Sequence, residues 1–224
     1  MTSDRSAQRG WTLLGLAIAF LSLPLVVGVF TALHVSITVA PVVLRELIVF
    51  GAAAALAFII RRKEGLGWAS VGLQHPAIGK TAIWVAISIP CVALSLVMAF
   101  GLIKLLELPF GSGPDAEAFA ALPTWIMLLV IVRAGFVEEF FYRGYAIERL
   151  HSLTGHRYLS AVVSLLLFAV FHFRQGWAGI IIALLTGVVL TGVYLRTGNL
   201  WITIITHFLG DFIPNIVLPL FVAQ

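Results

Sequence analysis

Two adjacent carboxylates, Glu138 and Glu139, lie in the mostly apolar stretch of residues 136–144. On a helix these side chains point about 100° apart, and Arg143 follows Glu139 by four residues, so that those two can pair along one face. Glu138 is then expected to have no cation in its own helix, and desolvation suits such a carboxylate to act as a general base. The alternative is a purely structural network in which both carboxylates pair with Arg133 and Arg143.

Two further apolar stretches carry histidine. Residues 168–172 end at His172, and residues 206–211 place His207 and Asp211 four positions apart, which is one face of a helix. A lone histidine in an apolar helix is more often a hydrogen-bonded core residue than a catalyst. Polar groups on three separate stretches favour a shared site, because each ionisable group at the centre of a membrane helix costs about 2.5–3.5 kcal/mol on insertion scales.

The elements that position these groups are predicted to be membrane helices. Of the 224 residues, 61% are hydrophobic and 11% charged, and the mean hydropathy is +1.07, whereas soluble domains are about 45–50% apolar and about 25% charged. Stretches of about 20 mostly apolar residues, each able to cross a hydrocarbon core of about 30 Å, recur along the chain. They lie at about 11–33, 41–60, 80–104, 122–150, 158–173, 177–195 and 200–222. The sequence therefore predicts an all-α polytopic transmembrane bundle of seven spans, or eight if Pro214 and Pro219 split the last one.

The chain is expected to form one integrated bundle with two parts. Residues 1–120 would hold the first three spans and a cytosolic loop at 61–79, and residues 121–222 would form the catalytic membrane core. The first apolar stretch is too long for the h-region of a signal peptide, so we expect it to be a retained span. Arg45 and Glu46 are expected at the membrane interface or paired with a loop.

Charge indicates the orientation and the partners. The net charge is +4, but no basic run alternates with exposed aromatic residues, so we expect no nucleic-acid partner. The lipid bilayer is the partner that the composition indicates, and the oligomeric state is left open. Short loops and the lack of a targeting tail favour a bacterial plasma (inner) membrane, and the basic residues favour a cytosolic N-terminus. The residues that this orientation places on the cytosolic side are Arg5, Arg9, Arg61, Arg62, Lys63, Lys80, Arg149, Arg157 and Arg196.

Helix rise provides a test of whether the polar groups can meet. Counted from the predicted cytosolic turns, Glu138 lies roughly 18 Å into the membrane, His172 roughly 21 Å, and His207 and Asp211 roughly 10–16 Å. We therefore expect these side chains to line one cavity that opens to the cytosol.

The order of the motifs resembles that of the CAAX prenyl protease and bacteriocin-processing family, also called the Abi family, of intramembrane glutamic endopeptidases. Its motifs are EExxxR, FxxxH, and HxxxN or HxxxD. This chain has Glu138 and Glu139 followed by Arg143, then Phe168 to His172, then His207 to Asp211, over about residues 120–222. The resemblance implies a peptidase that hydrolyses a peptide bond of a membrane-associated substrate.

The resemblance also implies a role for each motif. Glu138 would activate a water together with His172, the third motif would support the oxyanion, and Glu139 and Arg143 would hold the shape of the site. Members closest to the prenyl-protein proteases look to have asparagine at the position of Asp211.

An ionised Asp211 would repel an oxyanion, so it is either protonated or orients His207. This departure leaves open the natural substrate and whether it is prenylated.

No cofactor is expected. Two histidines and two carboxylates could bind zinc, which is the alternative, but the sequence lacks the compact H-E-x-x-H helix, and a metal-free site is favoured. Two other classes compete: an ion-coupled transporter, because Glu, His and Asp also build proton relays, and a catalytically silent immunity or export accessory protein. The inverted repeats and paired broken helices of transporters are not seen.

Overall fold

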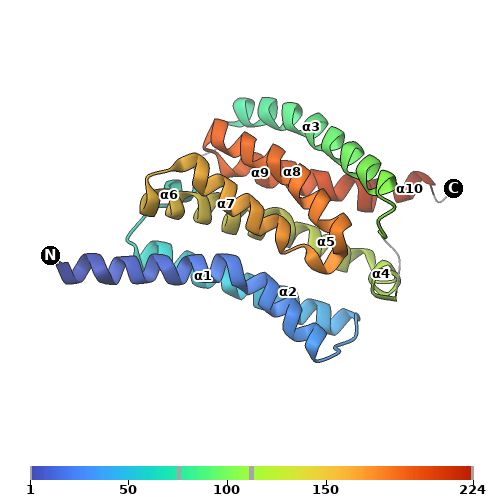
Figure 1. Cartoon of the computed structure of the whole chain (residues 1–224), viewed down its shortest axis with the longest axis horizontal. Coiled ribbons are helices and arrows are strands. Elements are labelled where there is room, and N and C mark those ends of the chain that lie inside the picture. Colours follow the sequence, from blue (N-terminus) through green and yellow to red (C-terminus); the bar gives the residue numbers. More distant parts are fainter. Residues whose placement is uncertain (1, 75–76, 111–113, 223–224) are drawn as a thin grey trace.

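The computed structural model describes residues 2–74, 77–110 and 114–222, and these residues form helices joined by turns, with no strand among them (Figure 1). The α-helices are α1 (Thr2–Ala32), α2 (Val39–Phe58), α3 (Ile78–Leu105), α4 (Pro114–Ala120), α5 (Thr124–Arg133), α6 (Glu148–Thr154), α7 (Arg157–Val170), α8 (Gly176–Thr197), α9 (Leu200–Phe212) and α10 (Pro219–Val222). Three π-helical segments, η1 (Ile59–Lys63), η3 (Ala134–Ile147) and η5 (Ile213–Val217), and two 3₁₀ turns, η2 (Trp68–Val71) and η4 (Phe173–Gln175), complete the order. The predicted all-α class is confirmed.

Among the described residues, five helices are long and apolar enough to cross a membrane. They are Ala7–Ala32, Val39–Lys63, Ile78–Leu105, Phe173–Thr197 and Leu200–Phe221. The α7 helix has only 14 residues, and the continuous helix from α5 to α6 carries the charged residues of the first motif. The structure thus supports an integral membrane protein, while the count of seven or eight spans stays a prediction.

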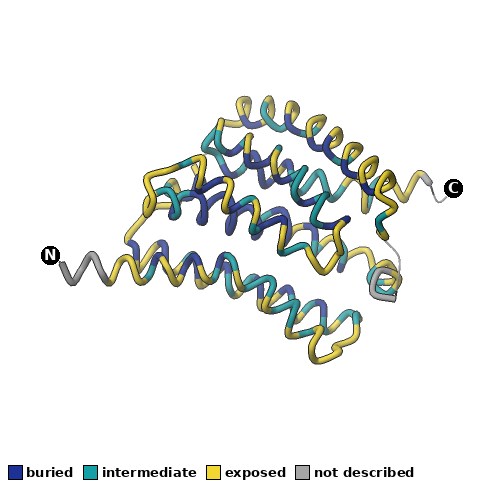
Figure 2. Tube along the Cα trace, viewed as in Figure 1, coloured by how far each residue is buried: buried dark blue, intermediate teal, exposed yellow. Residues whose placement is uncertain are grey.

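The helices pack as a bundle around η3. In Figure 1, α1 and α2 form one side and α3 the other, with the α5 to α6 helix, α7, α8 and α9 between them. Every residue of η3 except Phe136 is buried. Exposed positions follow the outward faces of the helices in Figure 2 and include many large apolar side chains, as expected of surfaces that face lipid.

Two glycines of η3 allow neighbouring backbone segments to approach it closely. A Cβ at Gly135 would lie 3.1 Å from the Cα of Phe208 in α9, and a Cβ at Gly144 would lie 2.9 Å from the carbonyl oxygen of Val71. A larger residue at either position would push against backbone, which cannot move aside. These glycines therefore let α9 and the connection after η1 lie directly against η3.

A buried polar cluster around Glu64 connects the helices at the end of the bundle near the N-terminus. Glu64 follows η1 and accepts hydrogen bonds from Thr12 Oγ1 (3.0 Å), the Tyr145 hydroxyl (2.8 Å) and Arg149 Nε (2.9 Å). Arg149 also donates to the carbonyl oxygen of Ser70 over 3.1 Å. Arg149, which the charge pattern placed among cytosolic loop residues, is only 5% exposed. The cluster joins α1, the connection between α2 and α3, and α6.

Candidate active site

Arg133 and Arg143 of the continuous α5 to α6 helix each form an ion pair with one of the two adjacent glutamates. Arg143 Nη1 donates to Glu139 Oε1 over 2.7 Å, which is the expected pair four residues apart. Arg133 Nη1 donates to Glu138 Oε1. The prediction that Glu138 has no cation in its own helix is therefore wrong. In an α-helix, positions five apart are separated by about 140°, whereas the i→i+5 bonding of a π-helix brings them close to one face.

Glu46 of α2 completes the Arg133 side of the site. It is 1% exposed, its Oε2 accepts from Arg133 Nε over 2.6 Å, and its Oε1 accepts from Arg45 Nε over 3.0 Å. The expectation that Glu46 pairs with a loop is thus wrong, because its partner Arg133 is the last residue of α5. Glu46 is the only acidic residue of α2. Because a buried arginine needs a carboxylate partner, a search for acids in the other apolar stretches could have identified Glu46 as a partner of Arg133.

His207 of α9 lies between two carboxylates. Its Nδ1 is 2.8 Å from Glu139 Oε1, and its Nε2 is 3.5 Å from Asp211 Oδ2. A neutral imidazole could donate to only one of them, whereas an imidazolium can donate to both. The predicted shared face of His207 and Asp211 is present, and it is turned toward η3 through Glu139.

His172 lies in the turn after α7, not inside a helix that runs to residue 173 as expected. The α7 helix ends at Val170, and the carbonyl oxygen of Phe168 accepts from His172 Nδ1 over 2.7 Å. The last four carbonyl groups of a helix lack helical partners, and the imidazole satisfies one of them. Because a carbonyl oxygen only accepts, Nδ1 carries the hydrogen and Nε2 of the neutral ring keeps its lone pair.

The first two motifs are in direct contact. The guanidinium of Arg143 lies 4.3 Å from the centre of the Phe168 ring, and the Phe168 ring packs edge to face on His172 with centroids 4.8 Å apart. Arg143 Nη2 also donates to the carbonyl oxygen of Gly187 over 3.5 Å. A Cβ at Gly187 would lie 3.2 Å from that nitrogen, so the small residue in α8 leaves room for the guanidinium.

The three motifs converge at Glu138. Its carboxylate lies within electrostatic range of His172 and His207, and Asp211 lies within electrostatic range of Glu138 and Arg133. The Glu138 side chain is 10% exposed and that of Asp211 is 39% exposed. Asp211 therefore marks the accessible edge of a site whose other carboxylates lie inside the bundle.

The histidines and carboxylates of the site are the groups that could bind a metal ion. Within residues 2–74, 77–110 and 114–222, no group of three or more His, Cys, Asp or Glu side chains is arranged to hold a metal ion. His172 keeps Nε2 available, with Nδ1 on a carbonyl oxygen, which is the usual arrangement of a zinc ligand. His207, in contrast, has both nitrogens facing carboxylates.

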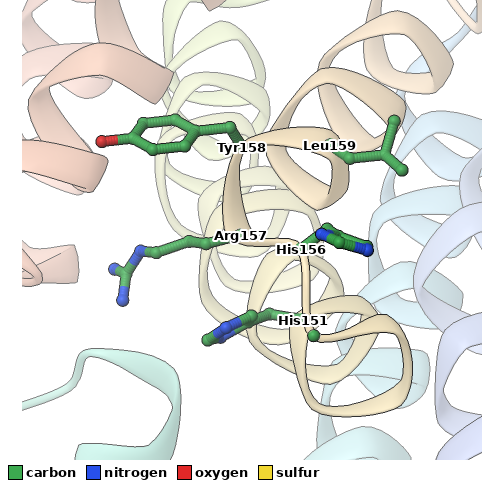
Figure 3. Close-up of a pocket in the computed structure, with 6 residues that line it drawn as sticks. His151, His156, Arg157, Tyr158 and Leu159 are labelled. Atoms are coloured by element: carbon green, nitrogen blue, oxygen red, sulfur yellow. The ribbon is translucent and has the colours of Figure 1, made fainter.

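A separate hollow lies at the turn between α6 and α7. Its lining includes His151, His156, Arg157, Tyr158 and Leu159, as Figure 3 shows. None of these residues belongs to the three motifs. The hollow is therefore distinct from the cluster around Glu138.

A bundle of apolar helices that surrounds buried glutamates and arginines and partly buried histidines defines a class of membrane protein equipped for acid and base chemistry. Residues 120–213 match the family model described as type II CAAX prenyl endopeptidase Rce1-like. This match covers less than half of the chain and is consistent with the CAAX protease family that the three motifs resemble. It contains all six candidate residues but excludes α2 with Glu46. Comparisons with curated proteins and with solved structures give no match.

Proposed function

We propose that the protein is an intramembrane endopeptidase that hydrolyses a peptide bond of a membrane-associated protein or peptide. Glu138 and His172 would activate the water. The observation that carries this proposal is the placement of the two groups: the Phe168 carbonyl oxygen holds Nδ1 of His172, which leaves Nε2 without a protein partner among the described residues, and the ring lies within electrostatic range of the Glu138 carboxylate. A base of this kind needs a carboxylate or imidazole within hydrogen-bond reach of the water, directly or through one more water.

The reaction can be written with all protons placed. The water oxygen attacks the carbonyl carbon of the substrate while Glu138 takes one water proton, and the carbonyl oxygen becomes an oxyanion. The protonated Glu138 then gives its proton to the leaving amide nitrogen as the carbon–nitrogen bond breaks. His172 Nε2 accepts a hydrogen bond from the second water hydrogen and holds the water in place.

The third motif would stabilise the oxyanion through His207. An imidazolium at this position donates Nδ1–H to Glu139, which fixes the ring, and directs Nε2–H toward Asp211. The 3.5 Å separation from Asp211 leaves Nε2–H without a short hydrogen bond, so a substrate oxyanion can take it. Asp211 then orients His207 and does not itself contact the oxyanion.

A metal-free site is part of the proposal. Zinc requires neutral imidazole ligands with nitrogen about 2.0–2.1 Å from the ion, whereas the proposed oxyanion role requires His207 as an imidazolium with Nδ1 facing Glu139 and Nε2 facing Asp211. Elemental analysis and chelator titration test this directly. Activity that persists with chelator supports the proposal, whereas about one zinc per chain with activity lost and regained in step would overturn it.

The function itself is tested with the full chain reconstituted in lipid nanodiscs. New peptide termini are identified by proteomics after incubation with wild-type protein and with Glu138→Gln. The matched control is Glu117→Gln, an exposed acid outside the site. We expect cleavage by wild type and by the control, and none by a normally folded Glu138→Gln. Equal cleavage by Glu138→Gln would exclude the proposed base.

We further propose a bacterial plasma membrane with the N-terminus in the cytosol. The support is the charge pattern of the sequence, which places most basic residues on the side of the N-terminus. Figure 1 shows α6, which carries Arg149, at the end of the bundle where the N-terminus lies. Labelling of single cysteines introduced at either end, in a Cys91→Ser background, tests the orientation. Labelling from the opposite side would reverse it.

A further inference from the structure

A series of ion pairs connects α2 with Glu138, the proposed base. Arg45 pairs with Glu46 Oε1 at 2.9 Å, Glu46 Oε2 accepts from Arg133 Nε at 2.6 Å, and Arg133 Nη1 donates to Glu138 Oε1. Glu46, Arg133 and Glu138 are all buried. None of the three motifs includes Arg133 or Glu46, and Glu46 lies outside the region that matches the family model.

The geometry of these ion pairs fixes the orientation of the Arg133 side chain. The guanidinium is planar, and two of its nitrogens are engaged by carboxylates from two different helices. Both oxygens of Glu46 are occupied, one by each arginine. Neither side chain can rotate without breaking a buried ionic hydrogen bond.

The consequence for Glu138 is that its two oxygens differ. Oε1 receives Arg133, while Oε2 has no hydrogen-bond partner within the described part of the chain and, unlike Glu139 Oε2, is not a fully buried unpaired atom. A neighbouring guanidinium stabilises a desolvated carboxylate in its ionised form, which a base requires. The free oxygen is then the one that faces the water.

We propose that Glu46 and Arg133 are positioning residues of the peptidase: Glu46 fixes Arg133, and Arg133 keeps the Glu138 carboxylate ionised and directs its Oε2 toward the water. The inference rests on the proposed function. It assigns α2, in the N-terminal part of the chain, a role in the reaction. Neither residue contacts the substrate, so the effect is on the rate of the chemical step.

The test measures kcat and KM on a peptide that wild type cleaves, with each value corrected for the folded fraction. Glu46→Gln should lower kcat by about 10–100-fold and Arg133→Gln by about 100-fold or more, with KM within about threefold of wild type, because misplacement of a catalytic group by about 1 Å can cost about 100-fold. Arg133→Lys should recover part of the loss, since it keeps the charge but not the fork. Glu46→Gln should cause no further loss in an Arg133→Gln background, because Glu46 acts only through Arg133.

The matched control is Glu64→Gln, which breaks a buried glutamate–arginine pair outside the site, that of Glu64 with Arg149. Arg149 lies about 16 Å along the helix from Glu138, so this variant should lose folded protein but keep the kcat of the folded fraction. A purely structural role for Glu46 predicts the same result for Glu46→Gln, and that result would overturn the inference. If Glu46→Gln does not fold, Glu46→Asp, which keeps the charge and withdraws it by one methylene, provides the same comparison.

The Glu138→Gln variant separates this inference from the proposed function. Inactive Glu138→Gln together with fully active Glu46→Gln and Arg133→Gln overturns the positioning role alone. Cleavage by Glu138→Gln at the wild-type rate overturns the proposed function, and the positioning role with it.

Discussion

Replacement of Arg143 by alanine should destabilise the fold as well as abolish activity. Arg143 and Glu139 are 1% and 0% exposed, and their ionic hydrogen bond is 2.7 Å long. Removing one partner of a buried pair costs about 3–5 kcal/mol, because the other charge stays desolvated. The contact of the guanidinium with the Phe168 ring at 4.3 Å adds about 0.5–2 kcal/mol, which places the loss near the upper end of that range.

Folded yield and unfolding curves in detergent measure this loss. At about 1.4 kcal/mol per factor of ten, it changes the ratio of folded to unfolded protein by about 100-fold or more. The control is the double variant Arg143→Met with Glu139→Gln, which removes both charges and keeps most of the volume. It should recover much of the stability, since replacing a whole buried pair by uncharged groups is often close to neutral.

The opposite result is equally clear. An Arg143→Ala protein with the folded yield and unfolding curve of wild type, but no peptidase activity, would refute the reasoning. Arg143 would then belong to the chemistry or to the substrate site, and the ion pair with Glu139 would contribute little to the fold.

Two further predictions address the third motif and the packing of the central helix. Asp211→Asn should keep kcat within about threefold of wild type. The amide oxygen can still face His207, and no carboxylate then opposes the oxyanion. Steady-state kinetics measure kcat, and a loss of about 100-fold would show that the charge of Asp211 is required. Gly135→Ala should lower the free energy of unfolding by about 1–3 kcal/mol. The new Cβ would lie 3.0 Å from Phe208 Cβ and 3.1 Å from Phe208 Cα and N. An unchanged unfolding curve would contradict the close approach of α9 to η3.

Much of the fold was predictable because apolar stretches long enough to cross a membrane have few alternatives to helix. The helices lie close to the predicted spans, and the pair of Glu139 with Arg143 followed from four-residue spacing. The contact of Glu138 with Arg133 did not, because hydrophobic patterns do not reveal where i→i+5 bonding replaces i→i+4. The end of α7 before His172 was also missed, since residues 168–172 remain apolar up to the histidine.

Long-range pairing was the other limit. Glu46 and Arg133 are 87 positions apart, and Glu64 and Arg149 are 85 apart, so no local spacing connects them. A physical rule would have narrowed the choice, because a charge inside an apolar bundle needs a partner of opposite sign. Applied to Arg133, that rule leads to the single acid of α2 as well as to Glu138.

The four buried glutamates show why only one is suited to act as a base. Glu46 has both oxygens engaged by arginines, and Glu64 accepts hydrogen bonds on both of its oxygens. Glu139 receives two donors on Oε1 and is 0% exposed, so its other oxygen is out of reach of water. Glu138 alone combines a cation on one oxygen, a second oxygen without a partner within the described residues, and a side chain that keeps 10% exposure beside His172. Three of these carboxylates therefore hold helices together, and the fourth retains an oxygen for chemistry.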